Sequence, residues 1–241
     1  MKRLIATILS FLFITGLCSC NTESHSSGNP DDAEQSYIHM PCSKENVDQF
    51  MATELAQSFK GVGLLEGYTL DKDQCFNVTP QAVAYETDYQ IFKFSDQSAS
   101  FIMIGDEAYT VCQWFGGHGF VNAIPWDFDN DGTKDLLVAS SWGSGLHRSI
   151  ISLFNCATKE STIIFDTAET DHPQIDLIVR AVTPSFSSRQ PSDYPTYYEV
   201  CSATVTMNDD NSADLSYVCT GVLGSVSVEN GELVFIPTSI S

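Results

Sequence analysis

The stretch Gly224-Ser-Val-Ser-Val-Glu-Asn-Gly-Glu-Leu-Val-Phe-Ile236 places two β-forming runs on either side of Asn230 and Gly231. Asn-Gly readily adopts the two positive φ angles of a type I′ turn, whose twist matches that of paired antiparallel strands. The sequence therefore predicts a β-hairpin here, and with it an antiparallel sheet near the end of the chain.

The same β pattern extends over most of the sequence. Short runs rich in Val, Ile, Phe and Tyr, separated by turn-forming residues, occur at 82–86, 89–94, 99–104, 108–115, 135–140, 149–154, 161–165, 175–182, 197–207 and 214–220. No period of 30 to 50 residues repeats, which argues against a complete propeller or solenoid.

One helix is expected ahead of these strands. Ser43 can cap its start and Gly61 can end it, and between them apolar residues recur at helical spacing at Val47, Phe50, Met51, Leu55 and Phe59. The predicted fold is mostly β, with antiparallel sheets in a sandwich-like or partial-propeller-like arrangement and one N-terminal helix packed on them.

The N-terminus has the features of an export signal. Met1-Lys2-Arg3 precedes an apolar run from Leu4 to Leu17, which is shorter than the roughly 20 residues that a membrane-spanning helix needs. The run ends in Leu17-Cys18-Ser19-Cys20, which resembles the lipobox of bacterial lipoproteins. The resemblance implies a signal peptide at 1–19 and a diacylglycerol on Cys20. The alternative is an ordinary signal peptide that is cleaved elsewhere.

The same resemblance suggests a location. Asn21 follows Cys20, whereas Asp at this place tends to retain enteric lipoproteins in the inner membrane, so the outer membrane of a Gram-negative bacterium is implied. Residues 20–41 are polar and predict a flexible, lipidated tether, and 42–241 predict a single β-rich globular domain. The membrane is thus an expected partner, through the N-terminal lipid.

The net charge limits which classes of molecule the protein is expected to bind. The chain has 11 Lys and Arg against 31 Asp and Glu, and its formal net charge is −20. Removal of the signal peptide would take away Lys2 and Arg3 but no acidic residue, which leaves −22. Such a surface repels nucleic acid and favours cations, although solubility alone also explains many of these charges.

Besides Cys18 and Cys20 the chain has six cysteines, and no two of them have C-x-x-C spacing. An even number of cysteines in a protein outside the cytoplasm indicates disulfides. Cys201 and Cys219 fall in two β runs that flank a turn centred near residue 210, so we expect them to face each other and form a disulfide. Two unbridged thiols are the alternative. The pairing of the others is left open: Cys42, Cys75, Cys112 and Cys156.

A compact set of oxygen ligands lies at 127–135. Carboxylates occupy positions 1, 3, 5 and 9 of this loop, Gly132 stands where the chain must turn sharply, and Thr133 can offer its backbone carbonyl. This arrangement is typical of calcium-binding loops, and the mutual repulsion of the carboxylates favours a bound cation. The predicted ligands of a structural Ca²⁺ are Asp127, Asp129, Asp131, Thr133 and Asp135. An acidic surface turn without metal is the alternative.

The pattern D-x-D-x-D-G-x-x-D followed by the apolar run 136–139 resembles the FG-GAP or VCBS repeat, the calcium-bearing hairpin of integrin-type propeller blades. The resemblance covers about residues 119–153, in a single copy. An EF-hand fits less well, because its twelfth position needs a bidentate Glu and is Val138 here.

Glycine-rich segments on both sides of the loop contain the residues of a candidate pocket: His118, Trp142, His147 and Arg148. The glycines would let a ligand approach the backbone, and His and Arg would supply polar contacts. The alternative is tight β-turns with a packed Trp and ordinary surface histidines. Two functions remain open. One is a non-enzymatic envelope module that binds an unknown protein or glycan partner. The other is a periplasmic hydrolase that uses His118 or His147. The sequence lacks G-x-S-x-G, H-E-x-x-H, P-loop and G-x-G-x-x-G motifs, which favours the first, and Asp176 belongs to no recognisable motif.

Overall fold

A computed structural model describes residues 44–59, 69–112, 116–171, 174–183, 196–207 and 215–238 of the chain. The chain divides into two units, 1–35 and 36–241, and all described residues belong to the second. The expected signal peptide, Cys20, the tether and Cys42 lie outside the described residues. None of the helices in the described ranges combines the length and apolar character that crossing a bilayer requires.

The described chain forms three four-stranded antiparallel sheets, each made of strands that follow one another in sequence. The first contains β1 (Cys75–Asn77), β2 (Gln90–Phe94), β3 (Ser100–Ile104) and β4 (Glu107–Cys112). The second contains β5 (Gly119–Trp126), β6 (Asp135–Trp142), β7 (Arg148–Asn155) and β8 (Glu160–Asp166). The third contains β9 (Asp176–Val182), β10 (Tyr197–Met207), β11 (Leu215–Glu229) and β12 (Glu232–Pro237).

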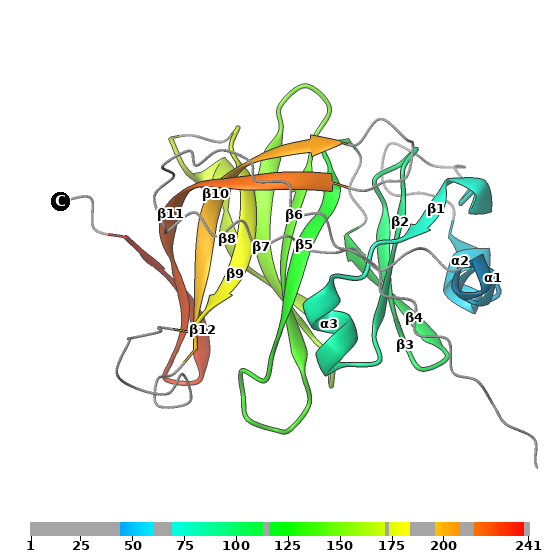
Figure 1. The fold of residues 1–241 in the computed structure, drawn as a ribbon, viewed down its shortest axis with the longest axis horizontal. Coiled ribbons are helices and arrows are strands. Elements are labelled where there is room, and N and C mark those ends of the chain that lie inside the picture. Colours follow the sequence, from blue (N-terminus) through cyan, green and yellow to red (C-terminus); the bar gives the residue numbers. More distant parts are fainter. Residues whose placement is uncertain are drawn as a thin grey trace, which may run out of the picture. The chain divides into compact units, whose positions relative to one another are not determined.

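Apolar contacts stack the second sheet between the other two (Figure 1). Along β6, Leu136 and Val138 join a core cluster with residues of the first sheet, whereas Leu137 and Ala139 join a cluster with residues of the third. Successive side chains of a strand point to opposite faces, so both faces of the second sheet are buried. This explains why β6 reads as a continuous apolar run rather than as an alternating one.

Two short helices cover the remaining face of the first sheet, where the sequence predicted one helix. They are α1 (Lys44–Met51) and α2 (Glu54–Ser58), and Phe50 of α1 is fully buried against Phe92, with ring centroids 4.9 Å apart. The expected helix from 43 to 61 is corrected at Thr53, whose Oγ1 donates to the Phe50 carbonyl and accepts the Ala56 N–H. A Thr in this position ends one helix and caps the next.

A second correction concerns 82–86, which was predicted as a strand and is the helix α3 (Gln81–Glu86). Pro80 precedes its first residue, and of its apolar side chains Val83 is fully buried while Tyr85 is 79% exposed. One buried side chain per turn suits a helix better than the alternation of a half-buried strand. The described residues also include two short 3₁₀ helices, η2 (Lys72–Gln74) and η3 (Thr167–Glu169).

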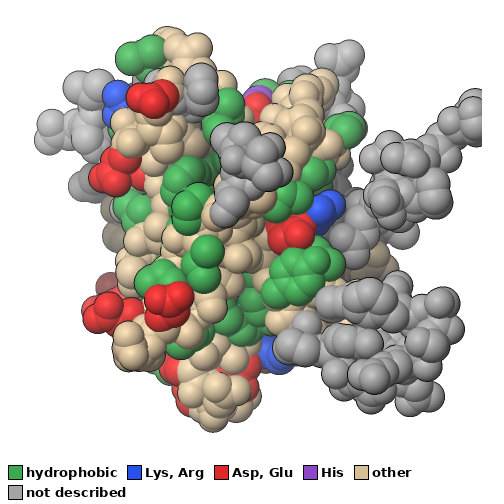
Figure 2. Space-filling model, turned by 90° about the vertical axis from the view of Figure 1, so that its left-hand side faces the viewer, with side chains coloured by type: hydrophobic (Ala, Val, Ile, Leu, Met, Phe, Trp, Pro, Cys, Tyr) green, Lys and Arg blue, Asp and Glu red, His purple; other side chains and the backbone are tan. Residues whose placement is uncertain are grey.

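The C-terminal hairpin is confirmed. Glu229 pairs with Glu232 across β11 and β12, and the two residues between them have positive φ angles, 54° at Asn230 and 83° at Gly231. On the outer side of this sheet, apolar side chains lie exposed among acidic ones (Figure 2). Among the described residues of the third sheet, the exposed large apolar side chains are Tyr197, Met207, Val218, Val222, Val228 and Ile236.

The expected pairing of Cys201 with Cys219 is wrong in register. Cys219 stands opposite Ala203, because the pairing of β10 and β11 that begins at Met207 and Leu215 is centred on residue 211 and not on 210. An irregularity at Ser202/Ala203 then places Cys201 opposite Val222. Both residues are thiols in the structure. Burial, together with the neighbouring Cys219 thiol, raises the pKa of Cys201 to about 12, so this sulfur packs as an apolar group.

Candidate functional site

The topology of the second sheet separates two groups of polar side chains. The loop 127–134 joins the end of β5 to the start of β6, whereas His118 precedes β5 and His147 precedes β7. The loop and the histidines therefore lie at opposite ends of the strands. Eight residues of extended strand span about 26 Å, which makes the two groups independent.

The loop gathers three carboxylates around one point. Ligand oxygens of Asp127, Asp129 and Asp131 lie within 4.8 Å of one another. Backbone N–H groups shape the loop from inside: Asp131 donates to Asp129 Oδ1 (3.2 Å), Gly132 to Asp127 Oδ2 (3.2 Å) and Thr133 to Asp131 Oδ1 (2.6 Å). Gly132 has a φ of 89°, which confirms the sharp turn expected at this glycine.

Asp135 lies beneath these carboxylates as the first residue of β6 and is only 1% exposed. Its Oδ1 accepts the Cys156 N–H (2.8 Å), but its Oδ2 is buried with no hydrogen-bond partner, and the same is true of Asp127 Oδ1. Burial and the repulsion from Asp127, Asp129 and Asp131 raise the pKa of Asp135 to about 6, against the lowering effect of the Cys156 N–H.

These oxygens have the chemistry of a hard-cation site. An unsatisfied buried acceptor costs about 1–3 kcal/mol, and more when it is charged. A cation among Asp127, Asp129 and Asp131 would offer a partner to Asp127 Oδ1 and reduce the repulsion that acts on Asp135, whose own oxygens are not part of that group of three. The residues present therefore fit Ca²⁺, and the strand that was expected after the loop is β6. The carbonyl ligand at Thr133 stays a prediction.

At the opposite end of the sheet, glycines let two loops touch backbone to backbone. Gly116 and Gly143 form a β-bridge. A Cβ atom added to Gly117 would lie 2.6 Å from the Trp142 nitrogen, and one added to Gly143 would lie 2.0 Å from the Leu146 carbonyl oxygen. The sequence suggested that these glycines admit a ligand to the backbone. In the structure it is another backbone segment that fills this space.

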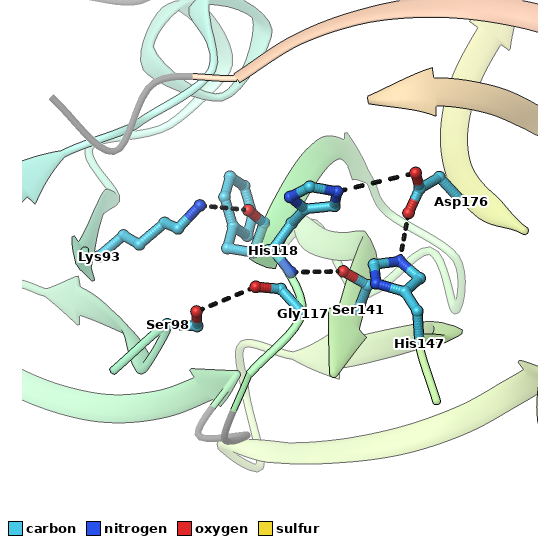
Figure 3. A network of polar contacts seen from close by, with 8 residues as sticks. Lys93, Ser98, Gly117, His118, Ser141, His147 and Asp176 are labelled. Atoms are coloured by element: carbon cyan, nitrogen blue, oxygen red, sulfur yellow. Dashed lines mark hydrogen bonds and ion pairs between the residues drawn. The ribbon is translucent and has the colours of Figure 1, made fainter. Parts of the chain in front are cut away.

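This close packing brings the two histidines to one carboxylate (Figure 3). His118 Nε2 lies 3.7 Å from Asp176 Oδ2, and His147 Nε2 contacts Asp176 Oδ1 directly. The imidazole centroids are 5.1 Å apart. The His118 backbone is held in place by its N–H, which donates to Ser141 Oγ (2.8 Å), and by the Gly117 carbonyl, which accepts from Ser98 Oγ (3.2 Å).

Asp176 is the first residue of β9, and its side chain is 18% exposed. Burial alone would raise its pKa, but the neighbouring imidazoles of His118 and His147 outweigh that effect and hold the pKa of this carboxyl well below its usual range. Asp176 is therefore ionised at neutral pH. It presents one oxygen to each imidazole.

A buried amide fixes β9, and with it Asp176, against the second sheet. The Asn122 side chain, on β5, donates to the Val179 carbonyl (2.7 Å) and accepts the Val179 N–H (3.1 Å). Because β9 is an edge strand of its sheet, these two backbone groups face away from β10, and the amide pairs both of them. Asn122 is only 1% exposed.

The pocket predicted from sequence is only partly assembled. His118 and His147 meet, whereas Trp142 and Arg148 stand opposite each other on β6 and β7 and form their own pair, with the guanidinium carbon 5.3 Å from the indole centroid. Asp176 was missed because it lies 29 residues beyond His147 in sequence. Only the contact of the second and third sheets brings it close.

Within the described residues, two groups of side chains could hold a metal: Asp127, Asp129 and Asp131, and His118, His147 and Asp176. The likeness of the loop to FG-GAP and VCBS repeats rests on its own residues. No protein-family model, curated protein or solved structure matches this chain.

Proposed function

We propose that this protein is a lipid-anchored, extracytoplasmic module of the cell envelope whose β domain binds Ca²⁺ at 127–135 and has a binding or structural role. The observation that carries the proposal is the buried, unpartnered Oδ2 of Asp135, at the base of a loop in which three other carboxylates converge. A cation bound among these acidic side chains would reduce their mutual repulsion.

The ligand chemistry favours calcium over other ions. All the donors are oxygens, and the loop carboxylates are partly exposed, which suits the flexible coordination of Ca²⁺ better than the strict octahedron of Mg²⁺. The ion would tie the loop to the first residue of β6 and so stiffen the β5–β6 hairpin. Extracellular calcium modules have Kd values of about 10⁻⁴–10⁻³ M, which suits such a structural role.

A hollow beside the loop offers a place for a partner. It has a volume of about 580 Å³ and is lined in part by Trp126, Asp127 and Tyr198. The Trp126 and Tyr198 rings stack, with centroids 4.2 Å apart. Aromatic rings beside polar groups are common in binding surfaces for proteins and glycans, so a partner in this hollow would sense the state of the calcium loop.

Calcium is expected to raise the melting temperature of the metal-free protein. With the Kd range above, 10 mM Ca²⁺ stabilises the folded state by about 1.4–2.7 kcal/mol, a rise of roughly 3–10 °C, because the ion binds only the folded loop. Differential scanning calorimetry in EDTA and in CaCl₂ measures it. Asp131→Ala should abolish the rise, whereas Asp106→Ala, which removes an exposed acid from the β3–β4 turn, should preserve it. An unchanged melting curve at 10 mM Ca²⁺ would contradict the proposal.

The anchor has its own test. Cys20→Ser should abolish incorporation of radiolabelled palmitate and leave the precursor uncleaved, because the thioether to the lipid forms on this sulfur. Cys18→Ser, which removes the neighbouring thiol, should leave both labelling and cleavage intact. Labelling that persists in Cys20→Ser would show that another residue is the lipidated one.

A hydrolase that uses His118 or His147 is the second candidate, and the contact of both imidazoles with Asp176 favours it. A carboxylate that orients an imidazole is a common feature of general bases. However, the hydroxyls that contact this segment in the described residues bond to its backbone: Ser141 Oγ accepts the N–H of His118, and Ser98 Oγ donates to the Gly117 carbonyl. This geometry supports a nucleophilic serine mechanism less well than the calcium module.

A further inference from the structure

We infer that His118, His147 and Asp176 form a second metal site, separate from the calcium loop, that binds a divalent transition-metal ion such as Zn²⁺. The three donors come from three segments: the turn before β5, the β6–β7 connection and the first residue of β9. Their ligand atoms lie within 4.8 Å of one another. Figure 3 shows both imidazoles directed at the two oxygens of one carboxylate.

The spacing of the donors fits a small ion after a modest contraction. A tetrahedral Zn²⁺ with bonds of about 2.0–2.1 Å holds two of its ligands roughly 3.3 Å apart. His118 Nε2 and Asp176 Oδ2, at 3.7 Å, are already close to that separation. The direct contact of His147 with Asp176 is a hydrogen bond, so the proton on the imidazole occupies the direction in which the ion would bind. Metal binding replaces this bond by coordination.

The donor types select a different ion from that of the loop. Two imidazole nitrogens and one carboxylate oxygen suit Zn²⁺ and other first-row transition metals, whereas Ca²⁺ prefers oxygens alone. The three side chains are 18% to 28% exposed, so one side of the cluster faces solvent. Three protein ligands with an accessible fourth position are typical of zinc sites that hold a water or a small anion.

The surroundings hold the donors in place before any ion binds. Asn122 holds β9 at Val179, three residues after Asp176. Lys93 Nζ donates to the Phe120 carbonyl oxygen at 3.3 Å, two residues after His118. The contact between the Gly116 and Gly143 segments fixes the two loops that bear the histidines. Preorganised ligands lose little entropy on binding, which strengthens a metal site.

The experiment uses the full-length protein, purified in detergent and stripped of metal, in 5 mM CaCl₂ so that the calcium loop is occupied. Isothermal titration with Zn²⁺ at pH 7.5 is expected to show one site with a Kd below about 10 µM. Co²⁺, added in place of Zn²⁺, should give the visible absorption of a four- or five-coordinate ion with nitrogen ligands. Absence of a one-to-one site, in both measurements, would overturn the inference.

Variants assign the ligands. His147→Ala and Asp176→Asn should each weaken Zn²⁺ binding at least 100-fold and change the Co²⁺ spectrum, whereas the loop variant Asp131→Ala should leave both unchanged. Circular dichroism identifies variants that fold, and only folded ones are compared. If the histidines and Asp176 act only as a structural clamp, His147→Ala will lower the melting temperature while any Zn²⁺ affinity stays as in the parent, and that result also refutes the site.

Discussion

Asn122→Leu is expected to lower the free energy of unfolding by about 2–4 kcal/mol, although leucine is close to asparagine in size. The side chain is buried and pairs both backbone groups of Val179 at the free edge of β9. Leucine would leave a buried N–H and a buried carbonyl without partners, and each such group costs about 1–3 kcal/mol.

Urea denaturation followed by tryptophan fluorescence measures this loss, and an unchanged m value would show that the unfolded state is not altered. Gln81→Leu, which removes an amide that bonds within α3 to Tyr85 Oη, is a suitable control and should change stability by less than about 0.5 kcal/mol. If the two variants are equally stable, the amide of Asn122 does not hold the third sheet to the second.

The Asn122→Leu variant also tests whether the position of β9 affects the proposed metal site. Asp176 lies three residues from Val179 on the same strand, so a β9 that is less firmly held should let the carboxylate move away from His118 and His147. Zn²⁺ affinity should therefore fall by more than tenfold at temperatures where Asn122→Leu is still folded. Calcium binding, at the far end of β5, should not change.

Local chemistry determined how much of this fold could be predicted from the sequence. The hairpin at 224–236 and the strand after the loop were predicted because their turn residues and apolar runs are contiguous. The strand β5 was not among the predicted runs, since Asn122 and Pro125 interrupt its β pattern. Its polar side chain at 122 makes sense only with the third sheet in place, where it pairs with Val179.

Register and helix breaks depend on contacts that sequence spacing does not reveal. The position of Cys219 opposite Ala203 follows from a hairpin register centred on residue 211, one residue later than the spacing of the turn residues indicated, and an irregularity at Ser202/Ala203 then moves Cys201 opposite Val222. Thr53 divides the N-terminal helix because its hydroxyl competes for backbone hydrogen bonds, although the apolar spacing continues through it.

The two candidate sites also differ in how far the sequence could predict them. The carboxylates of the loop lie within nine residues, so their spacing alone indicated an oxygen-ligated cation. His118, His147 and Asp176 come from separate segments, and their meeting requires both the contact of two glycine loops and the docking of β9. The sequence indicated His118 and His147 as candidate site residues, but it did not indicate Asp176, the carboxylate that both imidazoles contact.

Gly143→Ala is expected to have the largest effect of the substitutions considered, a loss of about 3–5 kcal/mol. Gly143 has a φ of 117°, a backbone angle that residues with a Cβ atom rarely adopt. A Cβ atom at this position would also lie 2.0 Å from the Leu146 carbonyl oxygen. Backbone strain of this kind costs about 1–3 kcal/mol, and forcing the backbone apart adds a similar amount.

Gly145→Ala is the matched control, because Gly145 lies in the same loop with a φ of 101° but a Cβ atom there would meet nothing within 4 Å. It should lose only the conformational part, about 1–2 kcal/mol, so the difference between the two variants measures the close approach itself. That approach sets the position of His147, four residues after Gly143, and Gly143→Ala should therefore also weaken Zn²⁺ binding more than Gly145→Ala does. Equal losses of stability in the two variants would show that the glycine is required only for its φ angle and that the tight loop contact does not position the histidine.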